Sequence, residues 1–203
     1  PSVRKVLIVS HFCSDFETKG NNRFNYLAKL LGERGNQVAF LTSDFSHTKK
    51  RPRTADAADS VYQVTLIHEP GYNKNVSISR ILSHRQFGKN LRIELEKIDK
   101  PDVVYLAVPS LDAAMVTTKY CLANKVRLII DIQDLWPEAF SIALKRFGAP
   151  EAIFFPMKKS ADFVYRNADA VVAVSQTYLD RAYQVREKKD GHSVFIGTDL
   201  DVF

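Results

Sequence analysis

The sequence predicts an α/β protein with one doubly wound, mainly parallel sheet of six or seven strands. Short apolar, β-branched runs alternate with segments of helical periodicity, which is typical of parallel strands joined by crossover helices. The apolar runs are nearly continuous, as expected for strands that are covered on both faces. Right-handed crossovers leave few topologies. One Rossmann-like domain over 1–203 accounts for the chain, which shows no linker and no internal repeat.

Seven apolar runs are the predicted strands. The first reads KVLIVS, and the fifth, VRLIIDI, leads into a stretch of acids with the only tryptophan. The expected strands cover 5–10, 37–43, 61–67, 102–108, 126–132, 170–175 and 193–196.

Helical stripes separate these runs. Phe24, Leu27 and Leu31 mark one helix face, and Gly35 is placed to end that helix. A long basic helix is expected over 79–98, where apolar residues recur every three or four positions. Further helices are expected over 111–122, from about 137, over 151–167 and over 176–186.

Composition sets the class of protein and its partners. The 203 residues are 45% hydrophobic and 26% charged, which is ordinary for a globular protein. Cys13 and Cys121 show no metal-ligand spacing, so we expect no zinc site and a reducing compartment. No apolar run approaches the roughly 18 residues of a spanning helix, and a cytoplasmic protein is expected. The net charge of +6 favours anionic partners.

In such sheets, ligands bind beyond the carboxyl ends of the strands. The first of these loops, 11–23, contains neither GxGxxG nor GxxxxGK[ST], which excludes a dinucleotide fingerprint and a P-loop. His11 ends the first strand and is either a general base, a phosphate contact or a histidine packed under its own loop. Gly20, Asn21 and Asn22 precede a helix and offer backbone N–H groups to an anion, or an N-cap.

Two other strand ends carry hydroxyl groups. Ser110 follows the fourth strand and is the expected N-cap of the next helix, with a ligand contact as the second possibility. Ser175 is placed to cap the helix after the sixth strand, which leaves Gln176 free. Groups at a helix start suit a phosphate or a sugar hydroxyl.

The segment DIQDLWPE, 131–138, ends the fifth strand. Gln133 and Asp134 are expected at the mouth of the crevice, where Trp136 shapes the cleft or stacks on a sugar. Glu138 lies in the positive first turn of a helix. The alternative is a helix start in which Trp136 is a hydrophobic plug.

Several segments, in order and spacing, resemble the family-4 glycosyltransferases of the GT-B fold. They are DIQDLWPE at 131–138, YRNADAVVAVSQTYLD at 165–180, IGTDLDVF at 196–203 and LAKLLGERGNQVAFLTS at 27–43. The likeness is closest to the bacterial branch that builds surface polysaccharides and lipid-linked glycans. It implies that this chain is the N-terminal, acceptor-binding half of a two-domain enzyme.

The resemblance also implies the chemistry. The donor, a nucleotide-diphospho-sugar, is expected to bind mainly the C-terminal domain that this chain lacks, so this domain itself is expected to hold no cofactor and no metal. Sugar transfer with retention of anomeric configuration is implied for the full-length enzyme, and the isolated 203 residues are expected to be inactive. Less favoured alternatives are a free-standing Rossmann-like binding module, a subunit of a split enzyme and half of a sugar-nucleotide epimerase.

The likeness carries over to few positions. Gly20, with Asn21 and Asn22, corresponds to the family's glycine loop, which often has two glycines where this chain has one. Many members carry His-Asp after the fifth strand, whereas this chain has Gln133 and Asp134. Asp134 alone is therefore carried over as the catalytic residue.

Expected partners are a sugar or lipid-linked sugar acceptor, the C-terminal domain and an anionic membrane surface at the inner face of the cell. Basic residues gather in the loop 47–60, which is expected to be mobile, and along the helix 79–98. Phe154 and Phe155 lie beside two lysines, which suits a membrane face, unless both rings are core. No nucleic-acid-binding motif is present, so no nucleic acid is expected.

Overall fold

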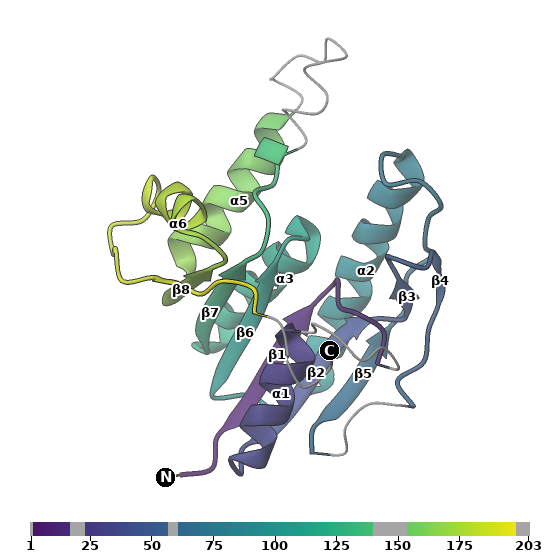
Figure 1. Ribbon diagram of the computed structural model, residues 1–203, viewed down its shortest axis with the longest axis horizontal. Helices are drawn as coiled ribbons and strands as arrows, with labels where there is room; N and C mark the ends of the chain where they lie inside the picture. The colour runs from purple at the N-terminus through teal and green to yellow at the C-terminus, as the bar shows by residue number, and fades with distance from the viewer. Residues whose placement is uncertain (1, 17–22, 57–60, 140–153, 198–203) are drawn as a thin grey trace.

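The structure, a computed structural model, describes residues 2–16, 23–56, 61–139 and 154–197. Within them the chain forms a seven-stranded parallel sheet of order β5-β2-β1-β6-β7-β8-β9 (Figure 1). This confirms the predicted fold class. The strands are β1 (Lys5–Ser10), β2 (Gln37–Ser43), β3 (Phe45–Ser46), β4 (Arg51–Pro52), β5 (Gln63–Ile67), β6 (Val103–Val108), β7 (Arg127–Ile132), β8 (Ala170–Ala173) and β9 (His192–Ser193). The helices are α1 (Arg23–Glu33), α2 (Ile78–Lys97), α3 (Leu111–Asn124), α5 (Phe155–Asn167) and α6 (Gln176–Tyr183).

Strand β1 shows why the apolar runs are continuous. Leu7 and Val9 pack into one hydrophobic core, and Val6 and Ile8 pack into another on the opposite face. Successive side chains of a strand point to opposite faces, so a strand with two covered faces needs apolar residues at every position.

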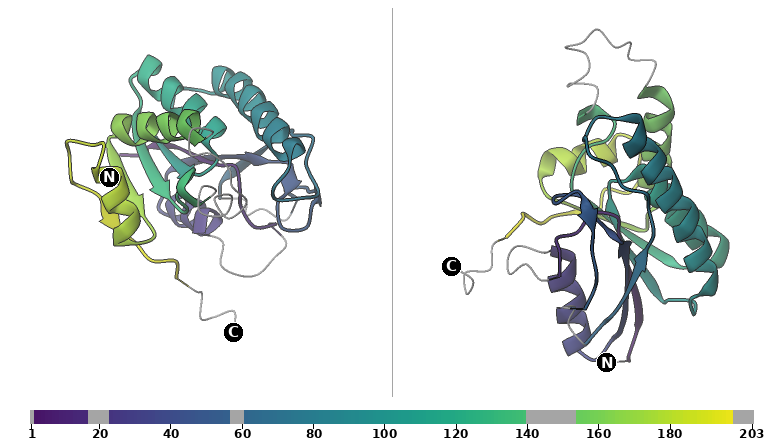
Figure 2. Two further views of the ribbon diagram at one scale, coloured as in Figure 1. Left: turned by 90° about the horizontal axis from the view of Figure 1, so that it is seen from above. Right: turned by 90° about the vertical axis from the view of Figure 1, so that its right-hand side faces the viewer.

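Helices cover both faces of this sheet (Figure 2). Helix α1 packs Phe24 and Ala28 against one face, while α2, α3 and α5 cover the other. Phe87, Leu91 and Leu95 form the apolar stripe that the sequence predicted for α2, and all three are buried. The switch in strand order lies between β1 and β6, where this class of sheet binds its ligands.

Some element boundaries differ from the predicted ones. Strand β8 ends at Ala173 because Ser175 already forms the N-cap of α6. The last strand is His192–Ser193 rather than 193–196, and β5 begins at Gln63. At the end of α1, Gly35 has the positive φ of 84° that favours glycine, as predicted.

The segment 47–60, expected as a surface loop, is more ordered than predicted over its described part. Its strand β4 pairs in an antiparallel hairpin with β3, which directly precedes the segment. The side chain of Arg53 is only 5% exposed and donates to the carbonyls of Ser43 and Cys13 and to Thr42 Oγ1. The guanidinium satisfies buried acceptors, so Arg53 does not belong to the exposed basic cluster that the sequence indicated.

The described residues include no helix that combines the length and apolar character of a membrane span. Cys13 and Cys121 are both free thiols, and burial raises the pKa of each.

Candidate functional site

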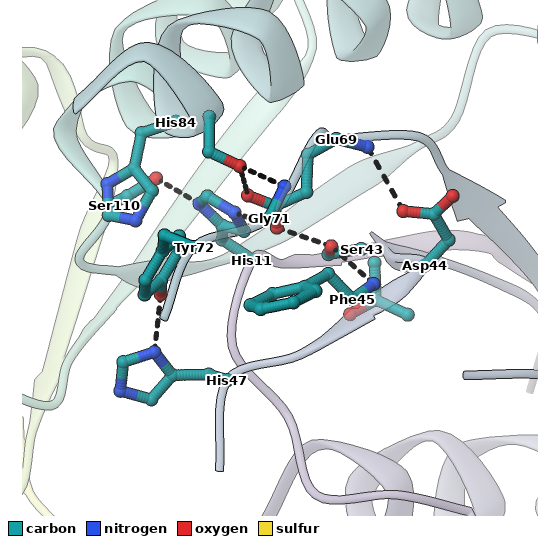
Figure 3. Close-up of polar contacts among 12 residues, drawn as sticks. His11, Ser43, Asp44, Phe45, His47, Glu69, Gly71, Tyr72, His84 and Ser110 are labelled. Carbon is teal, nitrogen blue, oxygen red and sulfur yellow. Dashed lines mark hydrogen bonds and ion pairs between the residues drawn. The ribbon is translucent and has the colours of Figure 1, made fainter. Parts of the chain in front are cut away.

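A network of buried polar groups lies at the carboxyl edge of the sheet, centred on Glu69 (Figure 3). Glu69 is 4% exposed. Its carboxylate accepts hydrogen bonds from His11 Nε2, at 2.8 Å, and from the hydroxyls of Ser43 and Ser83. Burial by itself raises the pKa of Glu69, but these hydrogen bonds and the nearby His11 outweigh it and hold the pKa at about 2. Glu69 is therefore an ionised, fully engaged carboxylate at neutral pH.

His11 is the second centre of the network. Its ring is 1% exposed and is stacked between Phe12 and Phe87, with centroid distances of 4.5 and 3.9 Å. Its Nδ1 lies 2.6 Å from Ser110 Oγ. Ser110 is the N-cap of α3, as predicted, but its hydroxyl binds His11 instead of the helix. Of the alternatives for His11, the structure shows the histidine packed beneath its loop, from where it orders the site.

Beside this network, the side chains of Tyr72, His84, Trp136 and Arg80 pack together, and we call this cluster the wall of the site. The ring of Trp136 lies nearly parallel to His84, at 5.9 Å between centroids. Arg80 Cζ lies 5.0 Å from the Trp136 ring and 5.5 Å from the Tyr72 ring. Burial, with the charges of His11 and Arg80, lowers the pKa of His84 to about 2. His84 is therefore neutral at physiological pH, and its Nε2 accepts from Arg80 Nε at 3.4 Å.

The loop after β7 places Asp134 at the N–H edge of the indole. Asp134 accepts from Leu135 N at 2.8 Å and from Trp136 Nε1 at 3.1 Å. Gln133 is partly exposed and donates from Nε2 to Asp131 Oδ1 at 2.6 Å. Asp131 itself is buried in β7 and forms an ion pair of 2.7 Å with Arg23 Nε. Asp134 thus fixes the orientation of the indole. Trp136 is 7% exposed and belongs to the hydrophobic core, as in the alternative of a hydrophobic plug, and it lies against Arg80 and His84.

Other predicted site residues form contacts elsewhere in the fold. Glu138 forms an ion pair with Arg181 of α6. Ser175 accepts from Tyr178 N at 3.4 Å, and Gln176 donates to Asp180 at 2.8 Å, so both bond within α6. Gly20, Asn21 and Asn22 lie outside the described residues.

A pocket of about 540 Å³ opens beside the network. Lys50, Glu69, Tyr72 and Ser79 are among the residues that line it. Within the described residues, no group of three or more His, Cys, Asp or Glu side chains is arranged to hold a metal ion. The site therefore offers hydrogen-bonding groups, aromatic faces and cations.

Sequence reasoning did not identify four residues that make this site, namely Glu69, Tyr72, Arg80 and His84. Two of them lie in the loop after β5, and the rule that ligands bind beyond strand ends includes that loop. The other two are one helical turn apart at the start of α2, a spacing that places them on one face.

The family model described as Glycosyltransferase Family 4 matches residues 20–199. The chain belongs to Glycosyltransferase Family 4. No curated protein sequence matches the chain.

Solved structures of glycosyltransferases agree with this family in fold. The chain is 14% identical to Arabidopsis thaliana UGT89C1 complexed with quercetin, with a TM-score of 0.56 over 95% of this chain and 50% of that one. It is 13% identical to Anabaena Alr3699/HepE in complex with UDP and glucose, with a TM-score of 0.56 over 98% of this chain and 46% of that one. Both have the GT-B fold, so the predicted relationship to that fold is confirmed. The family-4 chain spans about half the length of these proteins.

Proposed function

We propose that this chain is the acceptor-binding half of a nucleotide-sugar-dependent glycosyltransferase that makes surface polysaccharide or lipid-linked glycan. The observation that carries the proposal is a pocket beside the buried network, lined by Tyr72, whose ring contacts Arg80, which in turn contacts the buried Trp136. Aromatic faces pack against sugar rings, and the hydroxyl and guanidinium groups beside them bind sugar oxygens. The solved complexes of UGT89C1 with UDP-L-rhamnose and of HepE with UDP-glucose support a nucleotide-sugar donor.

In the full-length enzyme, an acceptor hydroxyl oxygen attacks the anomeric carbon of the donor sugar. The bond from that carbon to the diphosphate breaks, the nucleoside diphosphate leaves with the electron pair, and the hydroxyl gives up its proton. We assign stabilisation of the leaving diphosphate to a second domain. This half orients the acceptor, with Tyr72 lining the pocket, the buried Trp136 supporting Arg80 beside it, and Asp134 fixing the indole and facing the hydroxyl. Gln133, Ser175, Gln176 and the segment of Gly20, Asn21 and Asn22 remain predicted substrate contacts.

Replacing Trp136 by alanine should lower kcat/KM for sugar transfer by about tenfold, because Arg80 loses the buried ring that supports it beside Tyr72. The assay uses the protein encoded by the complete reading frame, a panel of radiolabelled nucleotide-sugars and a lipid extract of the source cells as acceptor. Trp136→Phe should recover most of the activity. Tyr26→Ala removes an aromatic ring from α1 that is 63% exposed and should change nothing.

Equal activity of Trp136→Ala and the wild type, with both folded, would exclude an acceptor site at this wall. The 203-residue chain alone should transfer no sugar. Transfer by that chain would instead favour a complete enzyme over the half that we propose.

A membrane partner is supported by the start of α2. Val76, Ile78, Ile81 and Leu82 are between 52% and 77% exposed. The exposed basic side chains around them are Lys74, Arg85 and Lys89. Aliphatic residues among cations suit an anionic lipid surface, which would also bring a lipid-linked acceptor to the neighbouring pocket. Of the two rings beside Lys159, Phe154 is buried and Phe155 is 56% exposed, so the prediction of a surface position holds for Phe155 alone.

Vesicles that contain anionic lipid should sediment the chain, and added salt should release it, since each basic residue contributes about 1 kcal/mol near such a surface. The double variant Ile78→Asp with Leu82→Asp should stay in the supernatant. Leu122→Asp is the matched control on α3, where Leu122 is 49% exposed, and it should bind normally. Equal sedimentation with neutral and anionic vesicles would argue against a charged membrane partner.

A further inference from the structure

Three basic side chains converge on Tyr72 at the outer end of the pocket. His47 Nδ1 is hydrogen-bonded to the Tyr72 hydroxyl (Figure 3). Lys50 Nζ lies 4.7 Å from the centre of the Tyr72 ring and 3.4 Å from His47 Nδ1, and Arg80 Cζ lies 5.5 Å from that ring. The side chains come from the β3–β4 hairpin and from α2, so the fold, and not their order in the sequence, brings them together.

Both permanent cations donate to oxygens of Asn75. Lys50 Nζ donates to Asn75 Oδ1 at 2.5 Å, and Arg80 donates from a terminal guanidinium nitrogen to the Asn75 carbonyl at 2.7 Å. In the part of the chain that the structure describes, no carboxylate forms an ion pair with Lys50. The carboxylate of Glu69 already accepts three side-chain hydrogen bonds.

Lys50 and Arg80 are both positively charged and lie beside the same ring, so they repel each other. Burial and the charge of Arg80 lower the pKa of Lys50. Burial, with the charges of Lys50 and Arg80, lowers the pKa of His47 to about 4. An anion between these groups would relieve the repulsion and favour the protonated form of His47.

We infer that Lys50, Arg80 and His47, arranged around Tyr72, form a binding site for a phosphate or pyrophosphate group. Such groups offer several oxygens to ammonium, guanidinium and imidazolium donors, and the bonds are charge-assisted. Lys50 and Tyr72 line the 540 Å³ pocket, which leaves room for the anion. Assigning that phosphate to the acceptor, as the group that joins its sugar to a lipid or as a free sugar phosphate, rests on the proposed function; binding of the anion itself does not.

The test is a titration of the chain with inorganic pyrophosphate at constant ionic strength, followed by NMR of the histidine rings. The chain should bind saturably, and the pKa of His47 should rise in the complex. Lys50→Met, which keeps the unbranched stem, should weaken binding by about tenfold through loss of one charge-assisted contact. Lys119→Met removes the same charge from an exposed position on α3 and should bind like the wild type.

Two further arms identify the source of the phosphate. Competition by vesicles that carry a polyprenyl phosphate would assign it to a lipid-linked acceptor, and competition by glucose 1-phosphate would assign it to a soluble one. Failure of pyrophosphate to saturate, or equal affinities of Lys50→Met and Lys119→Met in folded proteins, would overturn the site. If anion binding fails while Trp136→Ala still lowers sugar transfer, this inference falls and the proposed function stands.

Discussion

Replacement of Glu69 by alanine should lower the free energy of unfolding by about 3–5 kcal/mol. The substitution removes the shared acceptor of His11, Ser43 and Ser83 and leaves three buried donors without it. A buried group that loses its only well-placed partner costs more than the hydrogen bond itself contributes, because it was already taken out of water. Urea unfolding of the variant and the wild type measures the difference.

Two other variants distinguish the loss of the hydrogen bonds to Glu69 from a general effect of removing a negative charge. Glu69→Gln keeps the volume and one acceptor oxygen, so its loss should be smaller than that of the alanine variant. Glu96→Ala removes an exposed carboxylate on α2 that forms an ion pair with Arg92, and its effect should stay within about 0.5 kcal/mol. If Glu69→Ala is as mild as Glu96→Ala, the network contributes little to stability and its role is confined to ordering the site.

Acidification below about pH 6.5 should destabilise the protein through His84. The pKa of His84 is about 2 in the folded chain and 6.5 in an ordinary environment. Below pH 6.5, His84 is therefore protonated in the unfolded chain but still neutral in the folded chain. Stability therefore falls as the pH falls, by up to about 2–3 kcal/mol between pH 6.5 and 4.5 from this one residue. Glu69, with a pKa near 2, adds its own loss only below about pH 4.5.

The groups that act on His84 are His11, Arg80, Glu69 and His47, and of these His47 titrates in the same direction near pH 4. The contribution of His84 is therefore obtained from a difference: His84→Phe preserves the ring against Trp136 and should flatten the pH dependence of the unfolding free energy. His192→Gln changes an exposed histidine and should leave the dependence as it is. Parallel pH profiles of His84→Phe and the wild type would show that His84 is protonated with equal ease in both states.

The sheet could be predicted from the sequence because a strand that is covered on both faces needs apolar residues at consecutive positions. KVLIVS could be assigned from six consecutive letters, since both faces of β1 are covered. Trp136 and Asp134 were located for a related reason: the edge of a parallel sheet follows from where its strands end.

Glu69 and Arg80 could not be predicted in the same way. Glu69 meets its partners His11 and Ser43 across 58 and 26 positions of sequence, and no local pattern distinguishes it from an exposed acid. Ser110 shows the same limit. Its capping position was predicted locally, but its hydroxyl bonds to His11, 99 positions away, and only the folded chain decides between those partners.

The position of Trp136 has a practical consequence. It is the only tryptophan in the sequence, so all indole fluorescence of the chain originates beside His84 and Arg80. Emission should therefore respond, with no label attached, to a ligand that shifts Arg80 or the rings around the indole. Candidate acceptors can therefore be screened by the change that they cause in the intrinsic fluorescence of Trp136.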